Sequence, residues 1–152
     1  MRRRKPDQAE LRRRLRKGQR RRSTGERDQE INALRRRLRE GLHLTRGERL
    51  LLHRRAVSMT QRDAAAIYGV SLDVFREWEQ GLRDDVPRVS GPRVAELQVR
   101  ELLFVQRRRR GIGLDEIAAA LDRCDSWVHQ AEGGRTGVDR VVDYVLSQKV
   151  MT

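Results

Sequence analysis

A segment of the chain recurs after 53 residues, and this repeat constrains the fold more than any other feature. Residues 44–81 align with residues 97–134 without a gap. The identical pairs are Leu44/Leu97, Glu48/Glu101, Leu50/Leu103, Arg54/Arg107, Arg55/Arg108, Ala65/Ala118, Ala66/Ala119, Glu79/Glu132 and Gly81/Gly134. Apolar character is kept at Met59/Ile112, Tyr68/Leu121 and Phe75/Val128. Repetition at a fixed spacing indicates one structural module used twice.

Each copy carries the signals of short helices. In the first copy, residues 45–48 form a capping box, Thr60 and Ser71 can cap two further helices, and Gly69 and Gly81 can end them. Strands have almost no support anywhere. Because only 37% of residues are hydrophobic and 4% aromatic, thin-cored helical units are favoured over one large core. We predict an all-α fold with two small helix-turn-helix units in tandem, preceded by a basic arm that is partly disordered or helical.

The predicted organisation has six segments. They are an Arg-rich arm (1–22), an amphipathic helix (23–41), a first helix-turn-helix unit (42–81), a linker (82–92), a second, divergent unit (93–134) and a C-terminal helix (135–152). The S-x-x-E pattern at residues 23–26 predicts the start of the amphipathic helix, and Gly41 its end. Pro92 fits the first turn of the next helix.

The net charge of +13 is concentrated in the arm. Residues 1–39 hold 17 basic and 5 acidic side chains, a balance of +12, and the rest of the chain has a balance of +1. Such an asymmetry is typical of an arm that binds a polyanion. The alternative is a solvated tail without a partner.

A helix-turn-helix requires particular residues at fixed places. A small residue is needed where the two helices cross, and Ala65 and Ala118 supply it. The tight turn requires a residue that tolerates positive φ, which Gly69 provides freely and Asp122 acceptably. The second helix must bury one face, here with Phe75, while its N-terminal turn stays open to a groove.

Residues 50–81 resemble the Cro/phage-repressor helix-turn-helix family. The matching elements are the helix start Thr60-Gln61, the central Ala65, the turn Gly69-Val70-Ser71 and the closing Trp78-Glu79-Gln80-Gly81. The second copy resembles the family more loosely, because Ala131 replaces the Trp and Leu114 the Gln. An ordinary helical hairpin stays the alternative for this copy.

The resemblance implies which residues meet DNA. In the first unit these are Gln61, Leu72, Asp73, Arg76 and Glu77, and in the second Asp125, Ser126, His129 and Gln130. Phosphate contacts are expected from the arm and from the helix preceding each motif, at Arg2, Arg3, Arg4, Arg12, Arg13, Arg14, Arg20, Arg21, Arg22, Arg54, Arg55, Arg107 and Arg108. Neither recognition helix is basic. Asp73 and Glu77 can accept from cytosine N4, and Leu72 can contact a thymine methyl group.

Catalysis and cofactors have no support in the sequence. The three histidines do not lie at metal-ligand spacing with Cys124, which occupies the helix-cap position corresponding to Ser71. No nucleophile–base pair or phosphate-cradling glycine loop is present, so we predict a protein that is not an enzyme and has no cofactor or metal. No apolar run approaches membrane-spanning length, so no membrane partner is expected.

The sequence favours a sequence-specific transcriptional regulator of the phage-repressor type, cytoplasmic and nucleoid-associated, with double-stranded DNA as its partner. Two alternatives stay open. One is a packaging or assembly protein resembling a phage small terminase subunit; the other is an adaptor that binds RNA polymerase or another protein through the C-terminal part. Homodimerisation, the operator sequence and the sign of regulation are left open.

Overall fold

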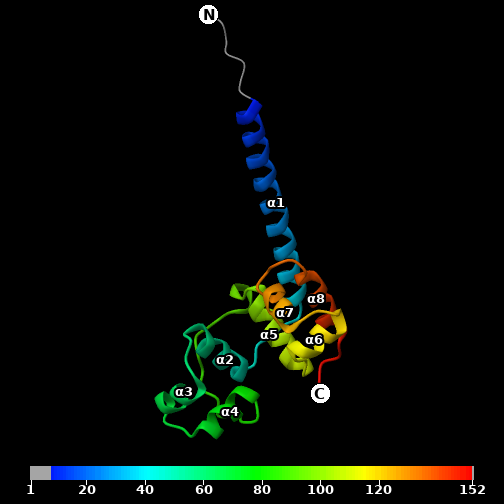
Figure 1. The fold of residues 1–152 in the computed structure, drawn as a ribbon. Coiled ribbons are helices and arrows are strands. Elements are labelled where there is room, and N and C mark those ends of the chain that lie inside the picture. The colour runs from blue at the N-terminus through cyan, green and yellow to red at the C-terminus, as the bar shows by residue number, and fades with distance from the viewer. Residues whose placement is uncertain (1–7, 152) are drawn as a thin grey trace, which may run out of the picture.

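The computed structural model describes residues 8–151, with the side chains of α1 described at Ala9, Arg12, Arg13 and from Gly25 onward. Every regular element in this range is helical (Figure 1), which confirms the predicted all-α fold. The elements are α1 (Gln8–Arg39), α2 (Arg46–Ala56), α3 (Gln61–Tyr68), α4 (Leu72–Gln80), a 3₁₀ turn η1 (Val94–Glu96), α5 (Val99–Arg110), α6 (Leu114–Leu121), α7 (Asp125–Glu132) and α8 (Val138–Ser147). None of these helices has the length and apolar character needed to cross a bilayer.

The sequence repeat is also a structural repeat. Helices α2, α3 and α4 begin at residues 46, 61 and 72, and α5, α6 and α7 begin at residues 99, 114 and 125, each 53 positions later. Within the copies, α3 packs on α4 and α6 packs on α7. The chain therefore contains two related three-helix groups, which we call the first unit (α2–α4) and the second unit (α5–α7).

The tight turns and helix caps follow the local sequence. Gly69 ends α3 at φ 68°, and Asp122 ends α6 at φ 52°, so both turns use the left-handed conformation that was expected. The hydroxyl groups of Thr60 and Ser71 each accept a hydrogen bond from the backbone N–H three residues further on. Cys124 stands at the position of Ser71, but its side chain makes no capping hydrogen bond.

The first unit has a small core of its own. Its buried residues are Leu50, Ala64, Ala65, Phe75, Trp78 and Val86. Helix α2 approaches the end of α4 so closely that a Cβ at Gly47 would overlap the carbonyl oxygen of Trp78. Val86, from the segment after α4, closes this core, so the predicted linker contributes to the unit that precedes it.

The second unit shares a larger core with the end of α1 and with α8. Leu34 and Leu38 from α1 are buried in it, and α8 buries Val138, Val141, Val142 and Val145. Leu42, Leu44 and Leu52 join the same cluster from the segment after α1 and from α2. This apolar contact connects the two units.

Helix α1 is continuous where a boundary was predicted. It runs through residues 23–26, so no helix begins at Ser23. The helix ends at Arg39 and Gly41 follows at φ 64°, as expected. Its last part is anchored by Arg27 donating to the Gly134 carbonyl (2.6 Å) and by Gln106 donating to the Leu38 carbonyl (2.7 Å). The N-terminal part of α1 projects away from the other helices (Figure 1).

The helix predicted to start near Pro92 begins later. Residues 82–93 contain no helix, Val94–Glu96 form only a 3₁₀ turn, and α5 starts at Val99. Glu101 accepts from the backbone N–H of Gln98 at 2.8 Å and so marks this start. Arg35 of α1 donates to the carbonyls of Leu97 (3.1 Å) and Ala95 (3.3 Å), which ties the 3₁₀ turn and the residue after it to α1.

Candidate nucleic-acid interface

The N-terminal turn of α4 is open to solvent. The side chain of Asp73 is 88% exposed and lies 3.7 Å from Arg76, one turn later. Glu77 is half-exposed and pairs with Arg83 at 3.2 Å, and Leu72 is partly buried. These four predicted residues therefore share one helix, and their charged groups engage partners that are themselves on the surface. Surface pairs of this kind are weak, so a groove of DNA could compete for them.

Gln61 lies at the start of α3 and is tied to the interior. Its amide nitrogen donates to the carboxylate of Glu79 at 2.7 Å. Its amide oxygen and its second N–H have no hydrogen bond within the described residues, so Gln61 keeps one acceptor and one donor for a base. The next residue, Arg62, is exposed and unpaired in the same part of the chain.

Arg54 does not reach the surface for the phosphate contact predicted from the sequence. Its Nε and Nη2 donate to the two carboxylate oxygens of Glu79, at 2.6 and 3.3 Å, and its Nη1 donates to the Met59 carbonyl at 2.8 Å. The side chain of Glu79 is 1% exposed and that of Arg54 is 15% exposed. Two of the guanidinium nitrogens thus join α2 to α4, and the third binds the segment before α3.

The same ion pair occurs in the second unit. Arg107 Nε lies 2.7 Å from Glu132 Oε1, and Arg107 Nη1 donates to the Ile112 carbonyl at 3.3 Å. The Nε–H is poorly aligned with the carboxylate and makes no hydrogen bond to it. Burial raises the pKa of Glu132, against the opposing attraction of Arg107. Arg107, like Arg54, is therefore a structural residue and not the predicted phosphate contact.

Arg108 and Arg109, also at the end of α5, connect the second unit to the first. Arg108 donates to the Glu79 carbonyl at 3.0 Å and so contacts the first unit, while its phosphate contact stays a prediction. Arg109 binds both oxygens of Glu48 at 2.7 Å. Burial raises the pKa of Glu48, but the hydrogen bonds from Arg109 and the Thr45 backbone outweigh it and leave that pKa below its ordinary value.

Arg55 stays at the surface. Its guanidinium stacks over the ring of Phe104, 3.8 Å from the centroid. Desolvation lowers the pKa of Arg55, and repulsion from Arg54, Arg100 and Arg107 lowers it further. The charged form of an arginine that is surrounded by several cations is stabilised by a nearby anion. Arg55 therefore fits the predicted phosphate role better than Arg54, Arg107 and Arg108 do.

The predicted contacts of the second unit lie together on α7. Asp125, Ser126, His129 and Gln130 are all exposed. Arg100 of α5 lies 2.9 Å from Nε2 of His129. Sequence reasoning missed Arg100, because it lies on α5, before the α6–α7 motif, and no local pattern marks it.

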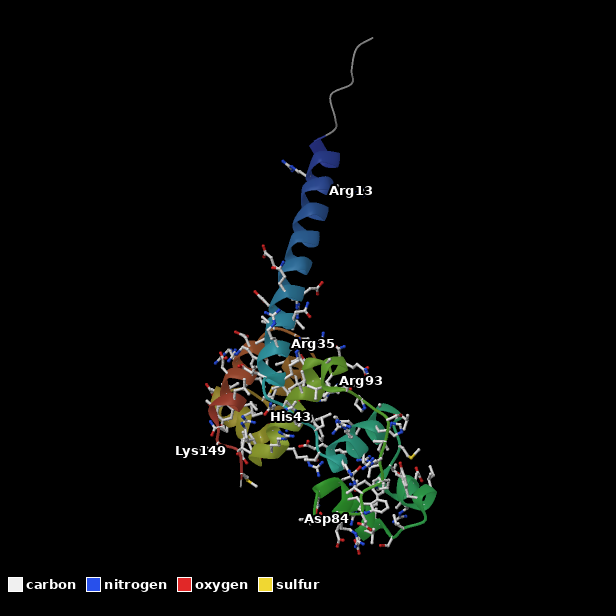
Figure 2. All side chains as sticks on the ribbon, turned by 180° about the vertical axis from the view of Figure 1, so that it is seen from behind. Arg13, Arg35, His43, Asp84, Arg93 and Lys149 are labelled. Carbon is white, nitrogen blue, oxygen red and sulfur yellow. The ribbon has the colours of Figure 1, made fainter. Side chains whose placement is uncertain are left out.

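The arm residues can be placed only in part. Arg12 and Arg13 are exposed on α1, and Figure 2 shows Arg13 on a stretch of helix with no other element beside it. Arg2, Arg3 and Arg4 lie outside the described residues, as do the side chains of Arg14, Arg20, Arg21 and Arg22.

Other chemistry is sparse in the part of the chain that the structure describes. No group of three or more His, Cys, Asp or Glu residues is arranged there to hold a metal ion. Comparisons with protein families, with curated proteins and with solved structures found no match to this chain.

Proposed function

We propose that this protein is a double-stranded-DNA-binding transcriptional regulator of the phage-repressor type, cytoplasmic and nucleoid-associated, without catalytic activity or cofactor. One observation carries the proposal. The first unit buries Phe75 and Trp78 on the inner face of α4 while Asp73 and Arg76 stay exposed on the outer face. This is the arrangement by which a recognition helix enters a major groove.

Helix α1 supports the proposal by its charge. It carries 13 basic and 4 acidic residues, a net charge of +9, along 32 residues. Like charges at this density oppose helix formation in isolation, and the phosphates of a nucleic acid relieve the repulsion. In the proposal α1 supplies affinity that does not depend on sequence, and α4 supplies base selection.

A second candidate is favoured by the acidic face of the second unit. Asp115 and Glu116 in the first turn of α6 and Asp125 in the first turn of α7 are acidic groups at helix starts, and all three are exposed. Carboxylates at these places would repel phosphates. In this candidate the second unit binds a basic surface of RNA polymerase or another protein while the first unit holds DNA.

Base reading by α4 is tested by replacing Asp73 and Glu77 with alanine. Selection of bound duplexes from a random library should then return a different preferred sequence, while overall affinity falls little, because two carboxylates leave a phosphate-lined groove. The control replaces Asp84 and Asp139, two exposed carboxylates outside α4, with alanine. An unchanged preferred sequence in the Asp73/Glu77 variant would remove α4 as a reader and leave the packaging and adaptor functions.

The arm is tested by deleting residues 1–22. The net charge of this segment is +10, and the slope of log K against log salt should become shallower by roughly 0.9 for each phosphate that the truncated protein no longer binds. The melting temperature should change little, because among the described side chains of α1 the buried ones, Leu34 and Leu38, lie beyond the deletion. An identical salt slope in the truncated protein would show that the arm does not bind DNA.

A further inference from the structure

An open cavity of about 310 Å³ lies beside the start of α2. Its lining residues are Arg46, Arg49, Pro87, Arg88 and Val89. Arg46 and Arg49 are one turn apart on α2, and Arg88 comes from the segment after α4. None of the three arginines is buried, and none has a hydrogen bond or ion pair with any residue that the structure describes.

The positive charge at this cavity is not neutralised within the fold. The carboxylate of Glu48, also in the first turn of α2, is occupied by Arg109 and by the backbone N–H of Thr45 at 2.9 Å. The positive end of the α2 dipole adds to the field of the three guanidinium groups, and cations at a helix N-terminus are unfavourable without a counter-charge. An anion in the cavity would relieve this repulsion.

The second unit shows that the module does not need these arginines to fold. The residues equivalent to Arg46 and Arg49 are Val99 and Leu102 of α5, which are buried in the core shared with α1 and α8. The same helix face is therefore apolar and covered in the second unit, but basic and open in the first. Its charge in the first unit is best explained by a ligand.

We propose that the cavity formed by Arg46, Arg49 and Arg88 binds a phosphate group. A guanidinium presents a planar set of N–H donors that matches phosphate oxygens, and a phosphate offers more acceptor oxygens than a single carboxylate can. The group belongs either to a nucleic-acid backbone or to free phosphate, and the chemistry of the cavity is the same for both. The proposal does not rest on base reading by α4, which uses other residues.

The test compares two triple variants of the full chain, each of which removes three positive charges. One is Arg46→Gln/Arg49→Gln/Arg88→Gln. The control is Arg36→Gln/Arg135→Gln/Arg140→Gln, at arginines away from the cavity. Two probes are used: a random-sequence duplex followed by fluorescence anisotropy over a range of salt, and sodium phosphate against sodium chloride of equal ionic strength, followed by the melting temperature.

If the phosphate belongs to a nucleic acid, the cavity variant should bind the duplex at least tenfold more weakly than the control does. Its salt slope should also be shallower than that of the control by roughly 0.9 per phosphate. If free phosphate is the ligand, sodium phosphate should raise the melting temperature of the wild type and the control in a saturable way, but not that of the cavity variant. Equal duplex binding by both variants, together with an equal response to phosphate, would overturn the proposal.

Discussion

Replacing Trp78 with alanine is expected to lower the free energy of unfolding by about 3–5 kcal/mol, the usual cost of truncating a large buried aromatic side chain. Trp78 is 6% exposed, and its ring centroid lies 5.9 Å from that of Tyr68 and 6.0 Å from that of Phe75. Its Nε1 donates to Asp85 at 3.0 Å, and hydrogen bonds from Arg83 and Trp78 hold the pKa of Asp85 at about 2. The destabilisation is measured by urea unfolding followed by circular dichroism.

Trp127→Ala is the matched control, because Trp127 is the other tryptophan of the chain and is only half-buried, in the second unit. Its replacement should cost clearly less than that of Trp78. An unfolding midpoint for Trp78→Ala equal to that of the wild type would place Trp78 outside the core of the first unit.

Glu79→Ala should destabilise the protein by a similar amount, about 3–5 kcal/mol, because it leaves a buried arginine without its counter-charge. The carboxylate of Glu79 accepts from Arg54 twice and from Gln61 once. Removing it leaves three N–H donors without an acceptor in a nearly closed site. The double variant Arg54→Met/Glu79→Leu should recover most of the stability, since apolar residues of similar size often replace a buried ion pair at little cost.

Glu132→Ala provides the comparison within the same molecule. Glu132 has the equivalent position, but the Nε–H of Arg107 is poorly aligned with it and burial raises its pKa. Its replacement should therefore cost less than that of Glu79. Equal urea midpoints for the wild type and Glu79→Ala would mean that the Arg54–Glu79 pair adds nothing to stability.

The sequence predicted the parts of the fold that local signals determine. The capping pattern at residues 45–48, the turn at Gly69 and the left-handed residue Asp122 all lie where they were placed. The repeat allowed Asp122 to be found, because nothing else marks it as a turn residue. The burial of the valines in α8 also follows directly from helical periodicity.

The partners of the arginines could not be predicted from local patterns. Arg54 binds a carboxylate 25 residues away, and Arg109 binds one 61 residues away. A guanidinium near a helix end is suited both to a phosphate and to a buried carboxylate, and only tertiary contacts decide between them. The repeat did carry one signal. Both copies keep an arginine (Arg54 and Arg107) and a glutamate (Glu79 and Glu132) at equivalent positions, which is typical of an ion pair within a module.

The prediction that a helix starts at residue 23 was wrong for a different reason. A capping box favours an N-terminus, but the residues on both sides of it can also continue a helix. The structure keeps one helix through this point. The helix therefore continues through Ser23, Thr24 and Gly25 although these residues have low helix propensity, because the segments on both sides of them are rich in arginine and leucine, which favour a helix.

The projecting part of α1 sets the shape of the molecule in solution. A compact chain of 152 residues has a radius of gyration of about 15 Å, and residues 8–26 extend the structure by about 27 Å at the helical rise per residue. Small-angle scattering should therefore report an elongated particle. At physiological ionic strength the Debye length is about 8 Å, so the charges at the tip of this rod and those of the body are screened from one another. The protein thus presents two electrostatic surfaces that respond to salt separately, one on the projecting part of α1 and one on the packed helices.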